Sequence, residues 1–208
     1  LTGIPAAPGL AKGSIITVSN QNITIPDYPI EDIESEIFRL ATARTAAKED
    51  ISSFKEKVKS ETDSNEAEIF EAHMMFLDDD SPISLAEQEI NTGKNAEAGW
   101  MKAVDFFAKQ LESIPDPMFA SRAMDVRDVG QRVVRHMMGL KQEVTKLTKP
   151  VIITGRDLTP SDTVSLDKRM VLAFVTAEGG PTSHTAILAK AFGLPAVVGL
   201  GEELLKVE

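Results

Sequence analysis

The chain has 208 residues, 42% of them hydrophobic, which supplies a core for one large domain or two modest ones. Its formal net charge of −10 argues against a nucleic-acid-binding protein, which normally carries a basic face. The absence of cysteine excludes a disulfide framework and a thiolate metal site. No apolar run approaches the roughly 20 residues of a membrane helix, and the N-terminal residues lack the features of a secretory signal. We therefore expect a cytoplasmic protein with no membrane insertion.

The first residues of the chain are rich in proline, glycine, isoleucine and threonine, and residues 14–18 predict a strand. From about residue 30 the pattern becomes helical. Apolar side chains recur in steps of four and three from Ile33 to Val58, which predicts one long helix packed against others. Similar spacing predicts further helices over residues 65–79, 100–111 and 126–137, so the middle of the chain is expected to be a helical bundle.

After residue 149 the pattern changes again. Short apolar runs at residues 151–154, 170–175 and 195–199 are typical of buried strands. Strand signals therefore flank a helical block. This order predicts an α/β domain formed by both chain ends, residues 1–29 and 142–208, with an all-helical bundle, residues 30–141, inserted into it.

Two helix starts lie between the last three strands. Residues 159–162 place a capping threonine, a proline and an aspartate where a helix begins. Thr182 and Ser183 open a second helix, with His184 in its first turn.

The segment from Gly179 to Lys190 is the strongest candidate for chemistry. Gly179 and Gly180 allow a sharp turn and the close approach of an incoming group. The helix start offers N–H groups and a partial positive charge, which suit a phosphoryl anion and keep His184 neutral and nucleophilic. Thr182 and Ser183 are placed to cap the helix or to donate to phosphoryl oxygens. Taken alone, the same residues also fit a surface histidine in an ordinary glycine-rich turn.

This segment resembles the phosphohistidine signature of the phosphoenolpyruvate-utilising enzymes. The signature consists of Gly-Gly, one variable residue, Thr-Ser-His and then a helix of small residues. Among these enzymes are enzyme I of the bacterial sugar phosphotransferase system, phosphoenolpyruvate synthase and pyruvate phosphate dikinase. The inserted helical block favours enzyme I, because the other two carry the histidine domain without it. Three further segments resemble enzyme I, at residues 3–9, 125–130 and 157–163.

The resemblance implies that Nε2 of His184 is phosphorylated and that Thr163 hydrogen-bonds the imidazole, although Thr163 also fits a plain helical hydroxyl. It further implies that a barrel domain beyond Glu208 binds phosphoenolpyruvate and Mg²⁺, so that residues 1–208 hold no cofactor. Pro181 departs from the family, in which a basic residue is frequent at this position, and one phosphate contact of the loop is therefore in doubt.

Residues 68–80 resemble the bundle segment to which enzyme I docks its histidine phosphocarrier protein. The resemblance implies that acidic side chains there meet a basic rim on the carrier, although the same charges also fit a solvated helix face. No metal site is expected, because the adjacent aspartates lack the spacing of a calcium loop. The expected partner-binding residues are Glu68, Glu71, His73, Asp78, Asp79 and Asp80.

The resulting hypothesis is phosphoryl transfer from phosphoenolpyruvate, through a phosphohistidine at His184, to a histidine phosphocarrier protein. Three alternatives stay open. The chain could belong to a paralogue in nitrogen regulation or dihydroxyacetone phosphorylation, or it could be a carrier-binding module without catalysis. A dikinase central domain is the third, and the helical insert counts against it.

Overall fold

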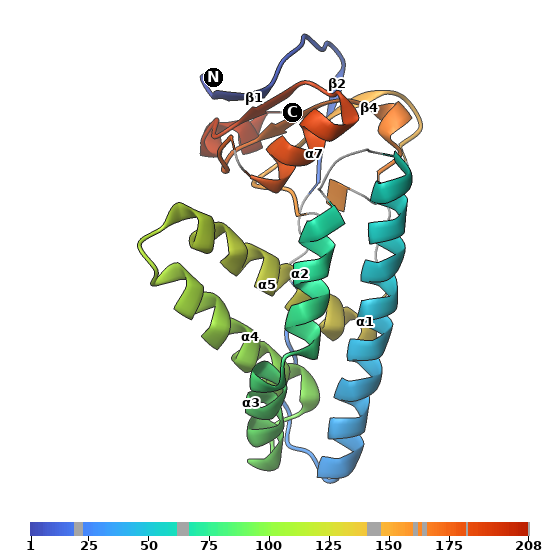
Figure 1. The fold of residues 1–208 in the computed structure, drawn as a ribbon, viewed down its shortest axis with the longest axis vertical. Helices are drawn as coiled ribbons and strands as arrows, with labels where there is room; N and C mark the ends of the chain where they lie inside the picture. Colours follow the sequence, from blue (N-terminus) through green and yellow to red (C-terminus); the bar gives the residue numbers. More distant parts are fainter. Residues whose placement is uncertain are drawn as a thin grey trace. The chain divides into compact units, whose positions relative to one another are not determined.

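The computed structural model describes residues 1–18, 23–61, 67–140, 147–159, 162–163, 166–181 and 183–207. The chain divides into two compact units, each made of segments that are distant in the sequence. The first unit comprises residues 1–21, 56–67 and 143–208, and the second comprises residues 22–55 and 68–142. An α/β part and a helical bundle are both present, as the sequence predicts (Figure 1).

The first unit is built on a five-stranded sheet in the order β1-β5-β4-β3-β2. Strand β1 pairs antiparallel with β5, and the other neighbours are parallel. The strands are β1 (Ile4–Ala7), β2 (Ser14–Thr17), β3 (Val151–Gly155), β4 (Val171–Thr176) and β5 (Ala196–Val198). Short 3₁₀ turns occupy η1 (Lys168–Met170) and η2 (Glu202–Lys206).

Helix α7 (His184–Phe192) packs against this sheet. Its small residues Ala186 and Ala189 belong to the same buried cluster as Ile153 and Phe174 of the strands, because small side chains let a helix approach a sheet closely. Strands β3 and β4 run parallel, so the loops that follow them leave the sheet at the same edge. This arrangement brings the loop after Gly155 next to the turn that leads into α7.

Strand β1 has no counterpart among the strands expected from the sequence. Pro5 lies within it, and proline lacks the N–H that a central strand would use. The structure accommodates Pro5 because β1 is an edge strand, with a register shift between Pro5 and Ala7.

The helical unit contains α1 (Ile33–Glu61), whose last residues join the first unit, α2 (Ala67–Asp78), α3 (Asp80–Asn91), α4 (Ala96–Glu112) and α5 (Pro117–Met137). The long first helix is confirmed. Helix α4 packs against both α3 and α5, with Trp100 fully buried and its Nε1 donating to the carbonyl of Gly130 at 3.1 Å. A Cβ at position 130 would stand 2.6 Å from Val104 Cγ1, so the glycine lets α4 and α5 approach each other.

Candidate functional site

His184 is the first residue of α7, and Ser183 is the helix cap. Ser183 has extended backbone angles, φ −65° and ψ 159°, and its Oγ accepts from the Ala186 amide at 3.4 Å. This is the arrangement by which a serine satisfies an N–H at a helix start. The helix therefore begins where the sequence predicts. The capping bond uses Ser183 Oγ as an acceptor, so the hydroxyl proton can still be donated to a bound group.

The two nitrogens of the His184 ring are in different surroundings. The side chain is only partly buried, but its Nδ1 atom is shielded from solvent. An incoming electrophile consequently cannot reach the ring through Nδ1 in this arrangement. The role of His184 as the phosphorylated residue is still a prediction.

The turn before the helix depends on Gly179. Its φ of +92° lies in the left-handed region that glycine tolerates and other residues rarely adopt. Gly180 lies in a more open place, where an added Cβ would meet no described atom within 4 Å. The two glycines thus differ: Gly179 is required by the backbone of the turn, and Gly180 leaves open space beside it. Thr182 lies outside the described residues.

Asp157 lies beside this turn, although its role was not anticipated from the sequence. Its Oδ1 accepts from the Leu158 amide at 2.8 Å and from Thr185 Oγ1 at 3.2 Å. Burial raises the pKa of Asp157 above its ordinary value, while these two bonds and the charge of His184 act in the opposite direction. The resemblance to enzyme I implies that the loop of residues 157–163 faces the active histidine, and the parallel order of β3 and β4 agrees, since each strand is followed by one of the two loops.

The loop that carries Thr163 begins with a reciprocal cap. Asp162 Oδ2 accepts from both the amide and the hydroxyl of Thr159, at 3.1 and 2.9 Å, and Thr159 Oγ1 accepts from the Asp162 amide at 3.2 Å. The capping role expected for Thr159 is confirmed. Thr163 is buried, and its hydroxyl donates to the Thr159 carbonyl at 3.2 Å. Its bond to the imidazole stays a prediction.

Lys190 reaches back from α7 to the loop before it. Its Nζ lies 3.3 Å from the carbonyl oxygen of Pro181. Residue 181 is a proline and carries no positive charge, but the ammonium group of Lys190 lies next to the carbonyl of this residue. The spacing of nine residues, more than two helical turns, explains why sequence reasoning overlooked it.

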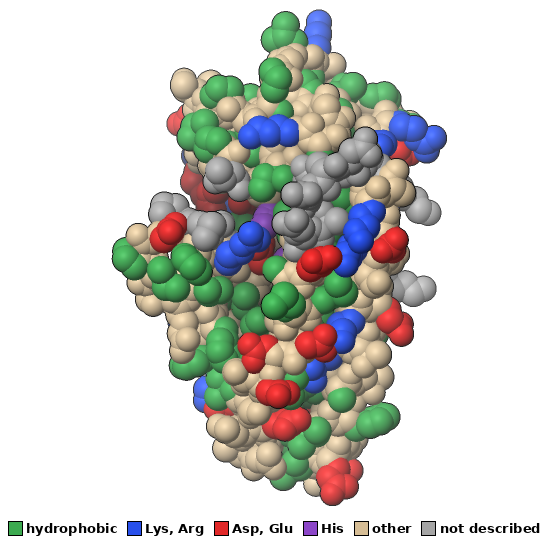
Figure 2. All heavy atoms as spheres, viewed as in Figure 1, with side chains coloured by type: hydrophobic (Ala, Val, Ile, Leu, Met, Phe, Trp, Pro, Cys, Tyr) green, Lys and Arg blue, Asp and Glu red, His purple; other side chains and the backbone are tan. Residues whose placement is uncertain are grey.

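The acidic residues of the predicted docking segment lie largely on the surface of α2 and at the start of α3. Figure 2 shows acidic side chains over these helices, with basic side chains among them. Glu71 pairs with Lys55 at 2.7 Å, and Asp78 pairs with Lys48 at 2.6 Å. Both lysines belong to α1, so part of the acidic charge is compensated by a helix remote in sequence.

The remaining members of the segment differ from one another. Asp79 caps α3, accepting from the Ser81 amide at 2.8 Å, and this bond lowers the pKa of Asp79. Asp80 is exposed in the first turn of α3, and the side chain of Glu68 lies outside the described part of the chain. Beside them Met75 is 72% exposed, an apolar surface residue of the same segment.

His73 does not present its ring at the surface, contrary to the expectation of an interface residue. The side chain is only 3% exposed. Its ring lies edge-on to Phe70 at 5.8 Å, and its Nε2 is 3.9 Å from Asp125 Oδ1 on α5. The residue packs inside the bundle because it falls on the same helix face as Phe70, which is also buried.

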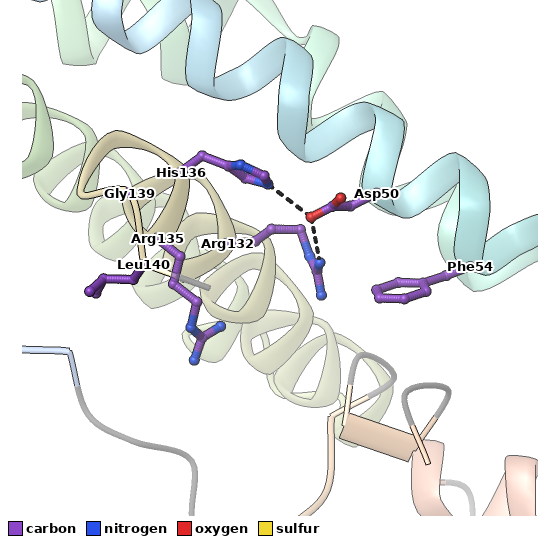
Figure 3. Close-up of a pocket in the computed structure, with 7 residues that line it drawn as sticks. All are labelled: Asp50, Phe54, Arg132, Arg135, His136, Gly139 and Leu140. Atoms are coloured by element: carbon purple, nitrogen blue, oxygen red, sulfur yellow. Dashed lines mark hydrogen bonds and ion pairs between the residues drawn. The ribbon is translucent and has the colours of Figure 1, made fainter. Parts of the chain in front are cut away.

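His136 belongs to a separate cluster, shown in Figure 3. His136 Nε2 lies 2.8 Å from Asp50 Oδ2, and Arg132 Nη1 lies 3.1 Å from the same oxygen. The Arg132 guanidinium also lies 4.8 Å from the centre of the Phe54 ring, so two residues of α1 engage α5 here. The cluster lines an open pocket of about 400 Å³. These contacts join α1 and α5.

Two negative findings concern only the described part of the chain. No group of three or more His, Cys, Asp or Glu side chains there is arranged to hold a metal ion. None of the helices described is both long and apolar enough to cross a membrane.

Comparison with known proteins decides the family. Residues 2–122 match the family described as PEP-utilising enzyme, N-terminal, and residues 147–208 match PEP-utilising enzyme, mobile domain, where PEP is phosphoenolpyruvate. The chain belongs to the phosphoenolpyruvate-utilising enzymes. The phosphoenolpyruvate-protein phosphotransferase of Priestia megaterium is 34% identical over 201 residues, covering 96% of this chain and 35% of the relative. The chain therefore spans about a third of the length of the curated relatives of this name.

Two solved structures that are named as enzyme I are similar to this chain. The NMR solution structure of Enzyme I (nEIt) is 39% identical, with a TM-score of 0.75 over 100% of this chain and 86% of that chain. The N-terminal domain of Enzyme 1 - Nitrogen has a TM-score of 0.63 over 95% of this chain and 82% of that chain. At 23% identity the second likeness supports the fold alone.

Proposed function

We propose that Nε2 of His184 accepts a phosphoryl group and passes it to a histidine phosphocarrier protein. The observation that carries this proposal is the position of His184, at the first residue of α7 with its Nδ1 buried. A phosphoryl group on Nε2 would be next to the N–H groups and partial positive charge of the helix start. The match to phosphoenolpyruvate-utilising enzymes across both halves of the chain supports the choice of donor chemistry.

In the first step, the Nε2 lone pair attacks phosphorus while the bond between phosphorus and its donor breaks. Ser183 and Lys190 are the described groups placed to receive phosphoryl oxygens, one through its hydroxyl proton and one through its ammonium group. Ser183 caps α7 and Lys190 belongs to it, so we expect both donors to be near the group when it arrives and to lower the reorganisation needed in transfer. In the second step, a ring nitrogen of the carrier attacks the same phosphorus and His184 becomes the leaving group.

The proposal assigns phosphoenolpyruvate and Mg²⁺ to a part of the whole protein outside these residues. The described part of the chain contains no group of three or more His, Cys, Asp or Glu side chains arranged to hold a metal ion. We expect a protein of residues 1–208 to exchange phosphoryl groups with a phosphorylated carrier, because phosphoryl transfer between two histidines changes the free energy little. It is not expected to use phosphoenolpyruvate.

The carrier is expected to dock on α2 and the start of α3. The exposed Met75 supplies an apolar contact there, and Glu71, Asp78 and Asp80 supply acidic charge beside it. Apolar contacts at the centre with charges at the rim are the usual composition of such an interface. Because lysines of α1 already pair with two of these acids, we expect Met75 to contribute more to affinity than Glu71 or Asp78.

The test is to incubate the chain with a ³²P-labelled phosphocarrier protein and measure label on each. Exchange in the wild type and in His136→Gln, and its loss in His184→Gln, is the expected result. Binding of the carrier without exchange would instead indicate a docking module that has lost transfer. Met75→Ala should weaken carrier binding roughly tenfold, and Phe106→Ala, which removes an exposed aromatic of α4, should not.

A further inference from the structure

We infer that Asp157 is a positioning residue that compensates the charge of the His184 ring while the ring carries a phosphoryl group. This inference rests on the proposed function and adds a second residue to the same site. It comes from the placement of Asp157 between the two segments that meet at this edge of the sheet.

The first observation is the way Asp157 joins the loop after β3 to the start of α7. Its Oδ1 is held by the Leu158 amide at 2.8 Å and by the hydroxyl of Thr185 at 3.2 Å. Thr185 directly follows His184 and is fully buried, and its hydroxyl also lies 3.4 Å from the Leu158 carbonyl, so both of its acceptors belong to the loop after β3. Asp157 therefore fixes the first turn of α7, and with it the position of the histidine.

The second observation concerns the other carboxylate oxygen. A Cβ built on Gly179 would lie 3.5 Å from Asp157 Oδ2, so this oxygen faces the position where a side chain of residue 179 would begin. The carboxylate thus lies beside the turn on one side and bonds the helix start on the other. His184 follows the turn in sequence and is the first residue of α7.

The third observation is electrostatic. The charge of His184 lowers the pKa of Asp157 in opposition to the dominant effect of burial. Because such coupling is reciprocal, the Asp157 carboxylate must favour the protonated His184 ring by the same free energy. Glu178 also faces Asp157 and raises its pKa, but Glu178 is exposed and bonded to Arg156, which also bonds Glu202. Lys190 adds a positive charge at this loop, with its Nζ 3.3 Å from the Pro181 carbonyl.

The chemistry shows why this charge is useful. When Nε2 attacks, its lone pair forms the N–P bond, and the electron pair of the broken bond stays with the donor. The Nδ1 proton remains on the ring, so no proton moves and the ring becomes positively charged. On transfer to the carrier, the N–P electron pair returns to Nε2 and the ring leaves as neutral imidazole. A nearby carboxylate favours the protonated ring. It therefore keeps the ring from having to leave as imidazolate, which is a far poorer leaving group than imidazole.

The experiment is an NMR titration of the histidine rings in chain 1–208. Only three histidines are present, and His184→Gln assigns the signal of His184. Asp157→Asn keeps an oxygen that can accept both hydrogen bonds but removes the charge. The midpoint of His184 should fall by about 0.5–1 pH unit in this variant. The matched control is Asp167→Asn, which removes an exposed carboxylate bonded to Arg169 and should leave His184 unchanged.

A midpoint of His184 that stays unchanged in Asp157→Asn, or that moves equally in Asp167→Asn, overturns the inference. If Asp157→Asn does not fold, the reciprocal titration decides: the Asp157 carboxyl signal should titrate at higher pH in His184→Gln than in the wild type, and an identical midpoint overturns the inference. Neither titration needs a phosphoryl donor. A chain that shows the coupling but no exchange with the carrier refutes only the proposed function, and a chain with exchange but no coupling refutes only the role of Asp157.

Discussion

Gly179 lies so close to Ser183 that a Cβ atom on the glycine would stand 3.2 Å from Ser183 Oγ and 3.3 Å from Ser183 Cβ. The turn and the helix cap are thus a single packed feature. Any side chain at position 179 would both push against the cap and occupy a positive φ.

Gly179→Ala is therefore expected to destabilise the chain by about 1–2 kcal/mol, from the left-handed backbone and the contact with Ser183. Gly180→Ala is the matched control, because a methyl group there meets no described atom within 4 Å. Thermal melting and the His184 NMR signal would be compared for both. Equal loss of stability in the two variants would contradict this account of the turn.

Asp157 makes a prediction about stability and pH. Burial raises its pKa in the folded chain above the unfolded value. Its contribution to stability is therefore fully present below the unfolded pKa and is lost as the pH rises through the folded pKa. Asp157→Asn carries no such penalty, so urea unfolding should show the variant gaining stability relative to the wild type as the pH rises above the ordinary aspartate pKa of 3.8. If the difference in free energy of unfolding between the variant and the wild type does not change with pH, the pKa of the Asp157 carboxyl is not raised.

Gly130→Ala tests the close approach of α4 and α5. The new methyl group would stand 2.6 Å from Val104 Cγ1, and overpacking of this kind costs about 1–3 kcal/mol, partly offset by the better helix propensity of alanine. Denaturant unfolding should show a net loss. The double variant Gly130→Ala with Val104→Ala should be more stable than the sum of the two single losses predicts. Strict additivity would mean that the two side chains do not meet.

Lys190→Met tests whether the ammonium group at Pro181 helps phosphoryl transfer. Loss of one charge-assisted hydrogen bond corresponds to roughly tenfold slower exchange with the carrier. Lys206→Met, an exposed lysine in the same unit, is the control and should exchange normally. Exchange at the wild-type rate in Lys190→Met would remove this lysine from the site.

Local signals predicted the start of α7 correctly. Ser183 as cap and His184 in the first turn follow from short-range rules, because a helix start depends on a few adjacent residues. The long helix α1 was equally clear, since its apolar spacing persists over many turns. Helix α3 was not anticipated, because Pro82 interrupts the pattern; the structure places this proline in the first turn behind the Asp79 cap, where it is tolerated.

Contacts between distant segments were the part that the sequence did not provide. Asp157 and Gly179 come together only because β3 and β4 are parallel neighbours. The pairing of Asp78 with Lys48 depends on how α2 lies against α1, which periodicity cannot specify. The burial of His73 has the same origin, since one helix face can serve either the core or a partner until its neighbours are known.

The most direct measurement is ³¹P–¹⁵N correlation NMR on chain 1–208, labelled with ¹⁵N-histidine and phosphorylated by its carrier. We expect one phosphorus resonance coupled to Nε2 of His184, and its disappearance in His184→Gln. A phosphorus resonance coupled to Nδ1 of His184, or to a ring nitrogen of His73 or His136, would contradict it.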